Sequence, residues 1–183
     1  MTKLGTFRPA LPLTPLILMA LLTVGQAADR EVDAQGDKEL ARLTQKIDKT
    51  AADGDADRVT ARIVGEWKGT RFKVDAASAP GALTLQDVQN LRAKGVGFGD
   101  ISILLALTAK QPNPASAKSL RYVFAVRQAG EGWSKIARDL GYKTLGSVIR
   151  SVKATERDVT RLAAERGQKP ERMGEMEKPG KRR

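Results

Sequence analysis

Two glycine-rich stretches of the chain resemble each other and limit what it can fold into. Residues 95–105 read Gly-Val-Gly-Phe-Gly-Asp-Ile-Ser-Ile-Leu-Leu, and residues 130–141 read Gly-Glu-Gly-Trp-Ser-Lys-Ile-Ala-Arg-Asp-Leu-Gly. One offset pairs the two glycines, the aromatic residue and two apolar residues of each stretch, and it also pairs Arg92 with Arg127. A match of this kind at one spacing indicates an internal duplication. We therefore expect two related units, at about residues 84–109 and 118–153.

In each stretch two glycines flank one residue and an aromatic residue follows. Glycine tolerates positive φ and close backbone approach, so the pattern predicts a sharp corner between two helices with the ring on its inner side. A phosphate-binding loop also uses glycines, but it needs a preceding strand, and no strand pattern precedes either stretch. The predicted corner residues are Gly95, Gly97, Phe98, Gly130, Gly132, Trp133 and Gly141.

The flanking sequence carries helix signals. Thr84 and Asp87 have the spacing of a capping box, which predicts a helix from there to about Lys94. A second helix is apolar on most of its circumference, so we expect it to be central, and Pro112 and Pro114 end it. These signals predict an all-α fold, a small domain of two helix-corner-helix repeats. The predicted core is Leu91, Phe98, Ile101, Leu104, Leu105, Val126, Trp133, Ile136, Leu140, Val148 and Ile149.

The first residues have the pattern of an export signal. Lys3 and Arg8 precede a short apolar run at 16–22, and Gly-Gln-Ala at 25–27 is a small-x-small cleavage site. An uncleaved anchor is the alternative, but prolines interrupt the run and it is shorter than the roughly 20 apolar residues that a spanning helix needs. We predict a signal peptide over 1–27, cleavage after Ala27, and a periplasmic or secreted protein.

The remaining chain divides into three parts by composition. Residues 28–57 are polar and acidic with a weak helical pattern, and we interpret them as a lead-in, either a loosely held helix or a linker. Residues 58–155 form the helical repeat domain, which begins with one amphipathic helix that carries Trp67. Residues 156–183 are basic with few apolar residues, which predicts a disordered tail.

Basic residues concentrate in the last third of the chain. Residues 134–183 contain 14 basic and 7 acidic residues. In an exported protein this excess favours an anionic envelope polymer, a lipid surface or another envelope protein as partner, and nucleic acid only if the chain is not exported. The candidate contacts to an anionic partner are Lys143, Arg150, Lys153, Arg157 and Arg161.

The residue types present offer little for catalysis. The chain has no His and no Cys, so it lacks a thiol nucleophile, an imidazole base and the usual transition-metal ligands. A carboxylate pair such as Asp100 with Glu131 would suit glycoside hydrolysis, although a helix-start acid and a turn glutamate explain these residues more simply. We expect no enzyme activity, no cofactor and no metal.

Residues 133–153 resemble the helix-turn-helix DNA-binding family, because Ile136, Ala137, Leu140 and Gly141 match its core and turn pattern. The resemblance implies that residues 145–151 would read bases. The residues it places toward DNA are Ser147, Arg150, Ser151 and Lys153.

The tandem pattern GxGFG and GxGWS, over about residues 58–153, also resembles a group of exported bacterial proteins with no assigned activity. That resemblance implies a compartment and an architecture. Our interpretation is an exported, non-enzymatic helical protein with a binding or scaffolding function in the periplasm or envelope. A helix-turn-helix DNA-binding regulator is the main alternative, and a small carboxylate enzyme is a third.

Overall fold

The structure is a computed structural model that describes residues 20–167, with side chains from 31 to 166. Most of the predicted signal peptide and residues 168–183 of the predicted tail lie outside the described residues. Within the described residues the chain divides into two units at Val32 and Asp33, and the hydrophobic core belongs to the second. None of the helices within the described range combines the length and the apolar character needed to cross a membrane.

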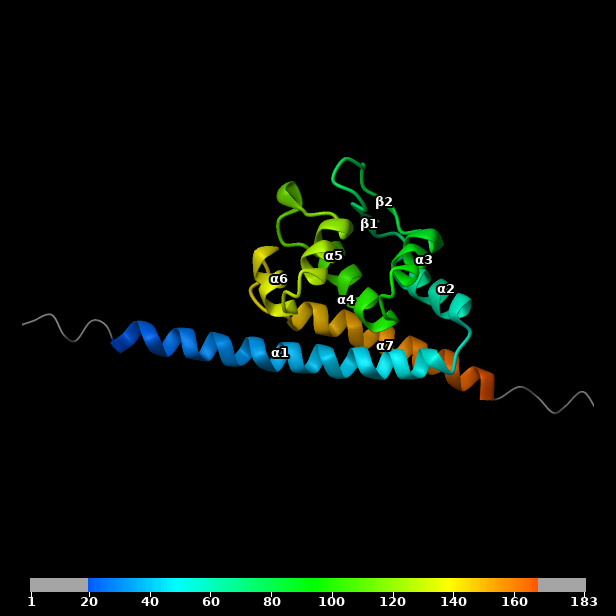
Figure 1. The fold of residues 1–183 in the computed structure, drawn as a ribbon, viewed down its shortest axis with the longest axis horizontal. Helices are drawn as coiled ribbons and strands as arrows, with labels where there is room; N and C mark the ends of the chain where they lie inside the picture. The colour runs from blue at the N-terminus through cyan, green and yellow to red at the C-terminus, as the bar shows by residue number, and fades with distance from the viewer. Residues whose placement is uncertain (1–19, 168–183) are drawn as a thin grey trace, which may run out of the picture. The chain divides into compact units, whose positions relative to one another are not determined.

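The described chain is mostly helical, which confirms the predicted all-α class. The exception is one short antiparallel pair of strands, β1 (Arg71–Phe72) with β2 (Gly81–Ala82). The helices are α1 (Ala20–Ala52), α2 (Ala56–Glu66), α3 (Leu85–Ala93), α4 (Phe98–Ala109), η1 (Pro114–Ser116), α5 (Leu120–Gln128), α6 (Trp133–Asp139) and α7 (Gly146–Gly167) (Figure 1).

Helix α4 is the centre of the core. Every residue from 101 to 108 is buried, and the helix packs against α3, α5, α7 and β1. Its two buried hydroxyls donate back to carbonyls one turn earlier, Ser102 to Phe98 and Thr108 to Leu104, both at 2.8 Å. No polar group of these side chains is therefore left without a partner. The nearly continuous apolar sequence of α4 requires neighbours on all sides.

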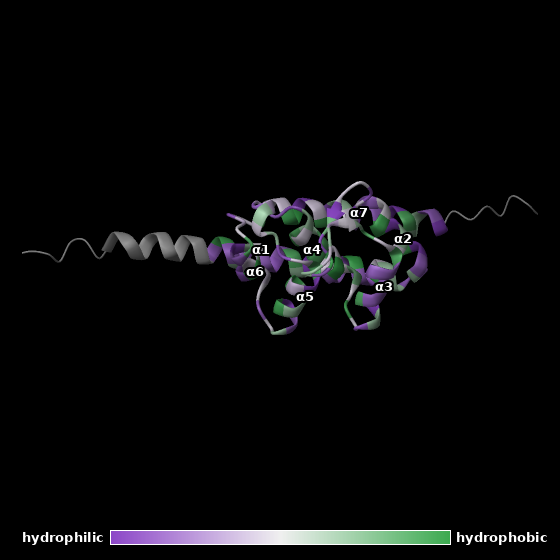
Figure 2. Cartoon of the chain, turned by 90° about the horizontal axis from the view of Figure 1, so that it is seen from above, coloured by the Kyte–Doolittle hydropathy of each residue, from purple (hydrophilic) through white to green (hydrophobic). Residues whose placement is uncertain are grey.

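Helix α7 is longer than predicted. We expected a helix to about residue 153 and disorder from 156, but α7 continues to Gly167. Val159 and Leu162 are buried and extend the apolar stripe of Val148 and Val152. Figure 2 shows hydrophobic and hydrophilic residues alternating along this helix. The tail prediction is therefore wrong for residues 156–167, because two apolar residues at helical spacing are enough to hold these turns against α2.

Helix α1 belongs to the core, so the linker interpretation of residues 28–57 is wrong for its helical part. Leu40, Leu43 and Ile47 are at most 2% exposed. They form one narrow apolar stripe, and a stripe of this width does not by itself predict that the helix packs against the repeats. The stripe suffices because polar side chains on both sides of it also make tertiary contacts, with the corners and with α7.

The local helix ends follow the sequence closely. Thr84 and Asp87 form the predicted capping box, with the Thr84 amide donating to the Asp87 carboxylate at 2.9 Å. The N-cap of α2 is Asp55, whose carboxylate accepts the Asp57 amide at 2.9 Å. Trp67 is a core residue, and its ring packs edge-on against Phe72 with centroids 5.6 Å apart.

Candidate functional site

The two glycine-rich corners begin where α3 and α5 end. Gly95 and Gly130 have φ of 80° and 92°, a conformation that costs residues with a Cβ free energy. At the first corner the Val96 amide donates to the Leu91 carbonyl at 3.2 Å, and the Gly95 amide donates to the Arg92 carbonyl at 2.9 Å. This pair of hydrogen bonds is the Schellman arrangement, which satisfies the last carbonyls of a helix and reverses the chain.

An arginine stacks on the aromatic ring of each corner. The Arg92 guanidinium lies 4.2 Å from the Phe98 ring centroid and donates to the Val96 carbonyl at 2.7 Å. The Arg127 guanidinium, at the corresponding position, lies 4.3 Å from the Trp133 centroid and donates to a corner carbonyl at 3.0 Å. Both rings are 4% exposed. The corner side chains are therefore engaged in contacts within the domain.

Helix α1 supplies a carboxylate to the start of the helix that follows each corner. The Gly99 amide of α4 donates to Asp48 at 3.0 Å, and the Ser134 amide of α6 donates to Asp37 at 2.9 Å. The N-cap residues of both helices are glycines without a capping side chain. The α1 carboxylates take over that role, since they accept a free amide and face the positive end of the helix dipole.

Sequence reasoning missed both of these carboxylates. Asp37 and Asp48 are 11 residues apart, which is about three helical turns, so both lie on the same side of α1. The sequence signal for these caps is the spacing of the two acids. This spacing does not by itself predict capping, because an exposed acidic face has the same pattern.

The first corner lies closer to α1 than the second. A Cβ on Gly97 would be 2.5 Å from the Asp48 carboxylate, and a Cβ on Gly99 would be 2.4 Å from the Thr44 Cα. At the second corner a Cβ on Gly132 would meet Asp37 at 3.4 Å, an ordinary contact. Close backbone approach therefore requires glycine only at the first corner.

The two carboxylates considered for catalysis have different surroundings. Asp100 lines a cleft of about 410 Å³ beside α1, and burial raises its pKa while nearby Arg127 lowers it. Glu131 is not among the residues lining that cleft and pairs with Lys135 at 3.1 Å. Asp100 thus lies in a partly buried site, and Glu131 takes part in a surface ion pair.

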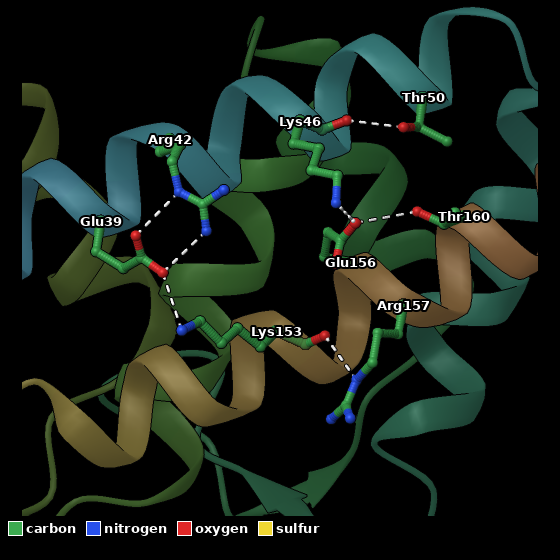
Figure 3. A network of polar contacts seen from close by, with 8 residues as sticks. All are labelled: Glu39, Arg42, Lys46, Thr50, Lys153, Glu156, Arg157 and Thr160. Atoms are coloured by element: carbon green, nitrogen blue, oxygen red, sulfur yellow. Dashed lines mark hydrogen bonds and ion pairs between the residues drawn. The ribbon is translucent and has the colours of Figure 1, made fainter.

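Ion pairs join α1 to α7, as Figure 3 shows. Glu39 accepts from Arg42 at 3.0 Å and pairs with Lys153 at 2.9 Å, and these two partners lower the pKa of Glu39 to about 2. Lys46 pairs with Glu156 at 2.6 Å and lowers the pKa of that carboxyl. Lys153 was predicted to contact an anionic partner, but its ammonium group is engaged with α1.

The basic face of α7 consists of Arg150, Lys153, Arg157 and Arg161, which recur at helical spacing and are all exposed. Arg161 pairs with Asp158 at 2.7 Å, and the Arg157 Nε donates to the Lys153 carbonyl at 3.2 Å. Arg150 and Arg157 form no ion pair within the part of the chain that the structure describes. Lys143 is exposed in the turn before α7. Arg150, Arg157 and Lys143 therefore present positive charge to solvent.

Between residues 20 and 167 the structure contains no cluster of acidic residues that could hold a metal ion. Comparisons with protein-family models, with curated proteins and with solved structures give no match to this chain.

Proposed function

We propose that this chain is an exported, non-enzymatic protein that binds an anionic partner of the cell envelope through the basic face of α7. The observation that carries the proposal is the row of exposed arginines on α7, two of which have no ion-pair partner within the described residues. Corner residues are a weaker choice for a ligand site, because their rings and amides are engaged within the domain.

Export is compatible with the contacts of α1. The predicted cleavage after Ala27 would leave residues 28–52 of the helix. The contacts from α1 to the corners and to α7 that are described above come from Asp33 onward. A processed chain would therefore keep both capping carboxylates and the apolar stripe of α1.

The DNA-binding alternative has less support. Of the residues that the resemblance places toward bases, Ser151 is buried and accepts from Lys110 at 2.8 Å. Lys153, the expected phosphate contact, pairs with Glu39. Only Ser147 and Arg150 remain available, which is a small surface compared with the set of base contacts that defines a recognition helix.

The test measures binding of the chain to vesicles of phosphatidylglycerol and of phosphatidylcholine. The variant Arg157→Gln/Arg161→Gln removes two charges from the basic face, and Lys38→Gln/Lys49→Gln removes two exposed charges from α1 as a matched control. At about 1 kcal/mol per basic residue near an anionic surface, the first variant should bind anionic vesicles roughly 30-fold more weakly. The control should bind with nearly unchanged affinity.

The proposal would be contradicted if both double variants lost the same affinity for anionic vesicles, or if the unsubstituted chain did not prefer anionic to neutral vesicles. Mass spectrometry of the mature N-terminus after cell fractionation tests export, with a product beginning at Ala28 as the expected result. Discrimination between DNA duplexes of different sequence at fixed salt would instead support the regulator.

A further inference from the structure

A cleft of about 350 Å³ opens where the ends of α2 and α4 meet the first turns of α7. It is separate from the two corners. Polar and aromatic side chains line it, among them Trp67, Thr70, Lys110, Ser147, Arg150 and Ser151.

Two cationic side chains, Lys110 and Arg150, line this cleft. The Lys110 Nζ donates to the Ser151 hydroxyl at 2.8 Å and lies 5.8 Å from the Trp67 ring centroid. An ammonium group has three donors, so this hydrogen bond leaves others for a ligand. The Arg150 Nη1 lies 3.9 Å from where a Cβ on Gly146 would be, which places the guanidinium beside the first turn of α7.

Trp67 lines the cleft and is itself buried. The residue is 5% exposed, and its indole Nε1 has no hydrogen-bond partner within the described residues. Unsatisfied buried donors are rare in folded proteins and cost free energy. Because the Lys110 ammonium lies 5.8 Å from the centroid of this ring, a ligand bound to Lys110 would come close to the indole.

One carboxylate, Glu66, also lines the cleft. It accepts from the Thr155 hydroxyl at 2.6 Å, and burial raises its pKa, with nearby Asp158 acting in the same direction. A single carboxylate does not cancel the two cations, and its ionised form is disfavoured by its surroundings. The cleft therefore remains electropositive.

We propose that this cleft binds a phosphate group through Lys110 and Arg150, with hydroxyl groups of Thr70 and Ser147 as further donors. Phosphate oxygens accept several charge-assisted hydrogen bonds at once, and Arg and Lys are their usual partners. Free phosphate and a lipid headgroup share this chemistry. The inference rests on the proposed function in one respect, since Arg150 also belongs to the basic face of α7.

The test is a titration with inorganic phosphate at constant ionic strength, followed by the fluorescence of Trp67. The variant Trp133→Phe leaves Trp67 as the only tryptophan, because the chain has two. Calorimetry on the unsubstituted chain checks that this replacement has no effect of its own. Lys110→Gln should weaken phosphate binding about tenfold or more, since a charge-assisted hydrogen bond is lost.

Lys118→Gln is the matched control. Lys118 also lies over an aromatic ring, 5.4 Å from the Tyr122 centroid, but outside the cleft, so its replacement should not change phosphate binding. A response to phosphatidylglycerol vesicles alone, lost in Lys110→Gln, would identify a lipid headgroup as the source. No response to either probe, or equal responses in Lys110→Gln and Lys118→Gln, would overturn the inference.

Failure of this inference can be told from failure of the proposed function. Vesicle binding that depends on Arg157 and Arg161, together with phosphate and vesicle binding that do not depend on Lys110, would leave the basic face and exclude the cleft. Phosphate binding that depends on Lys110, without any effect of Arg157→Gln/Arg161→Gln on vesicle binding, would leave the cleft and exclude the basic face.

Discussion

The two corners have the same set of contacts but differ in how closely α1 approaches them. Each has an arginine on an aromatic ring and a helix-start amide bonded to an α1 carboxylate. At the first corner α1 lies too close to Gly99 for a side chain at that position. At the second corner the matching residue is Ser134, and its hydroxyl donates to the Asp33 carbonyl of α1 at 2.9 Å. The similar sequences of the two corners thus form the same local contacts. How closely each corner packs against α1 depends on the position of α1.

Replacing the corner rings should have the largest effect. Trp133→Ala and Phe98→Ala should each lower the free energy of unfolding by roughly 3–5 kcal/mol, because each ring is buried and its removal leaves a cavity. Denaturant unfolding followed by circular dichroism measures this. An unchanged midpoint for either variant would show that its ring does not support the corner.

Exchanging the residues at the matched position should separate the two corners. Gly99→Ser should destabilise by about 1–3 kcal/mol, because its Cβ would meet the backbone of Thr44 at 2.4 Å. Ser134→Gly should cost less, about 1–2 kcal/mol, through the lost hydrogen bond and greater chain entropy. The same unfolding experiment measures both variants. If Gly99→Ser lowered the free energy of unfolding no more than Ser134→Gly does, α1 would not lie this close to the first corner.

The smallest effect concerns Asp100, which aligns with the exposed Lys135 at the second corner. Burial raises the folded-state pKa of Asp100, so its contribution to stability is fully present below about pH 3.8 and is lost as the pH rises through the folded pKa. Asp100→Asn should remove this loss and raise stability at neutral pH by at most about 1 kcal/mol after solvent screening.

Unfolding curves at about pH 4 and pH 7 measure the difference. Gln45→Asn serves as the control, because Gln45 lines the same cleft as Asp100 and neither amide side chain titrates. A wild-type curve that gains stability between the two pH values relative to Asp100→Asn would contradict the prediction.

The sequence alone was sufficient for features set by short-range interactions. The capping box at Thr84 and the burial of nine of the eleven predicted core residues follow from helix signals and apolar spacing, with Val126 and Ile149 partly buried. Each of these depends on neighbours within one or two turns, where backbone sterics and helix periodicity dominate.

The tertiary structure decided what distant residues do for one another. Asp37 and Asp48 became helix caps, and Lys153 became a partner of Glu39. Lys110 and Arg150, 40 positions apart, came to line the same cleft. An acid or a lysine has the same appearance in sequence on a solvated face and in a buried contact. Which of the two it makes depends on the helix that packs against it, and that choice depends on the whole core.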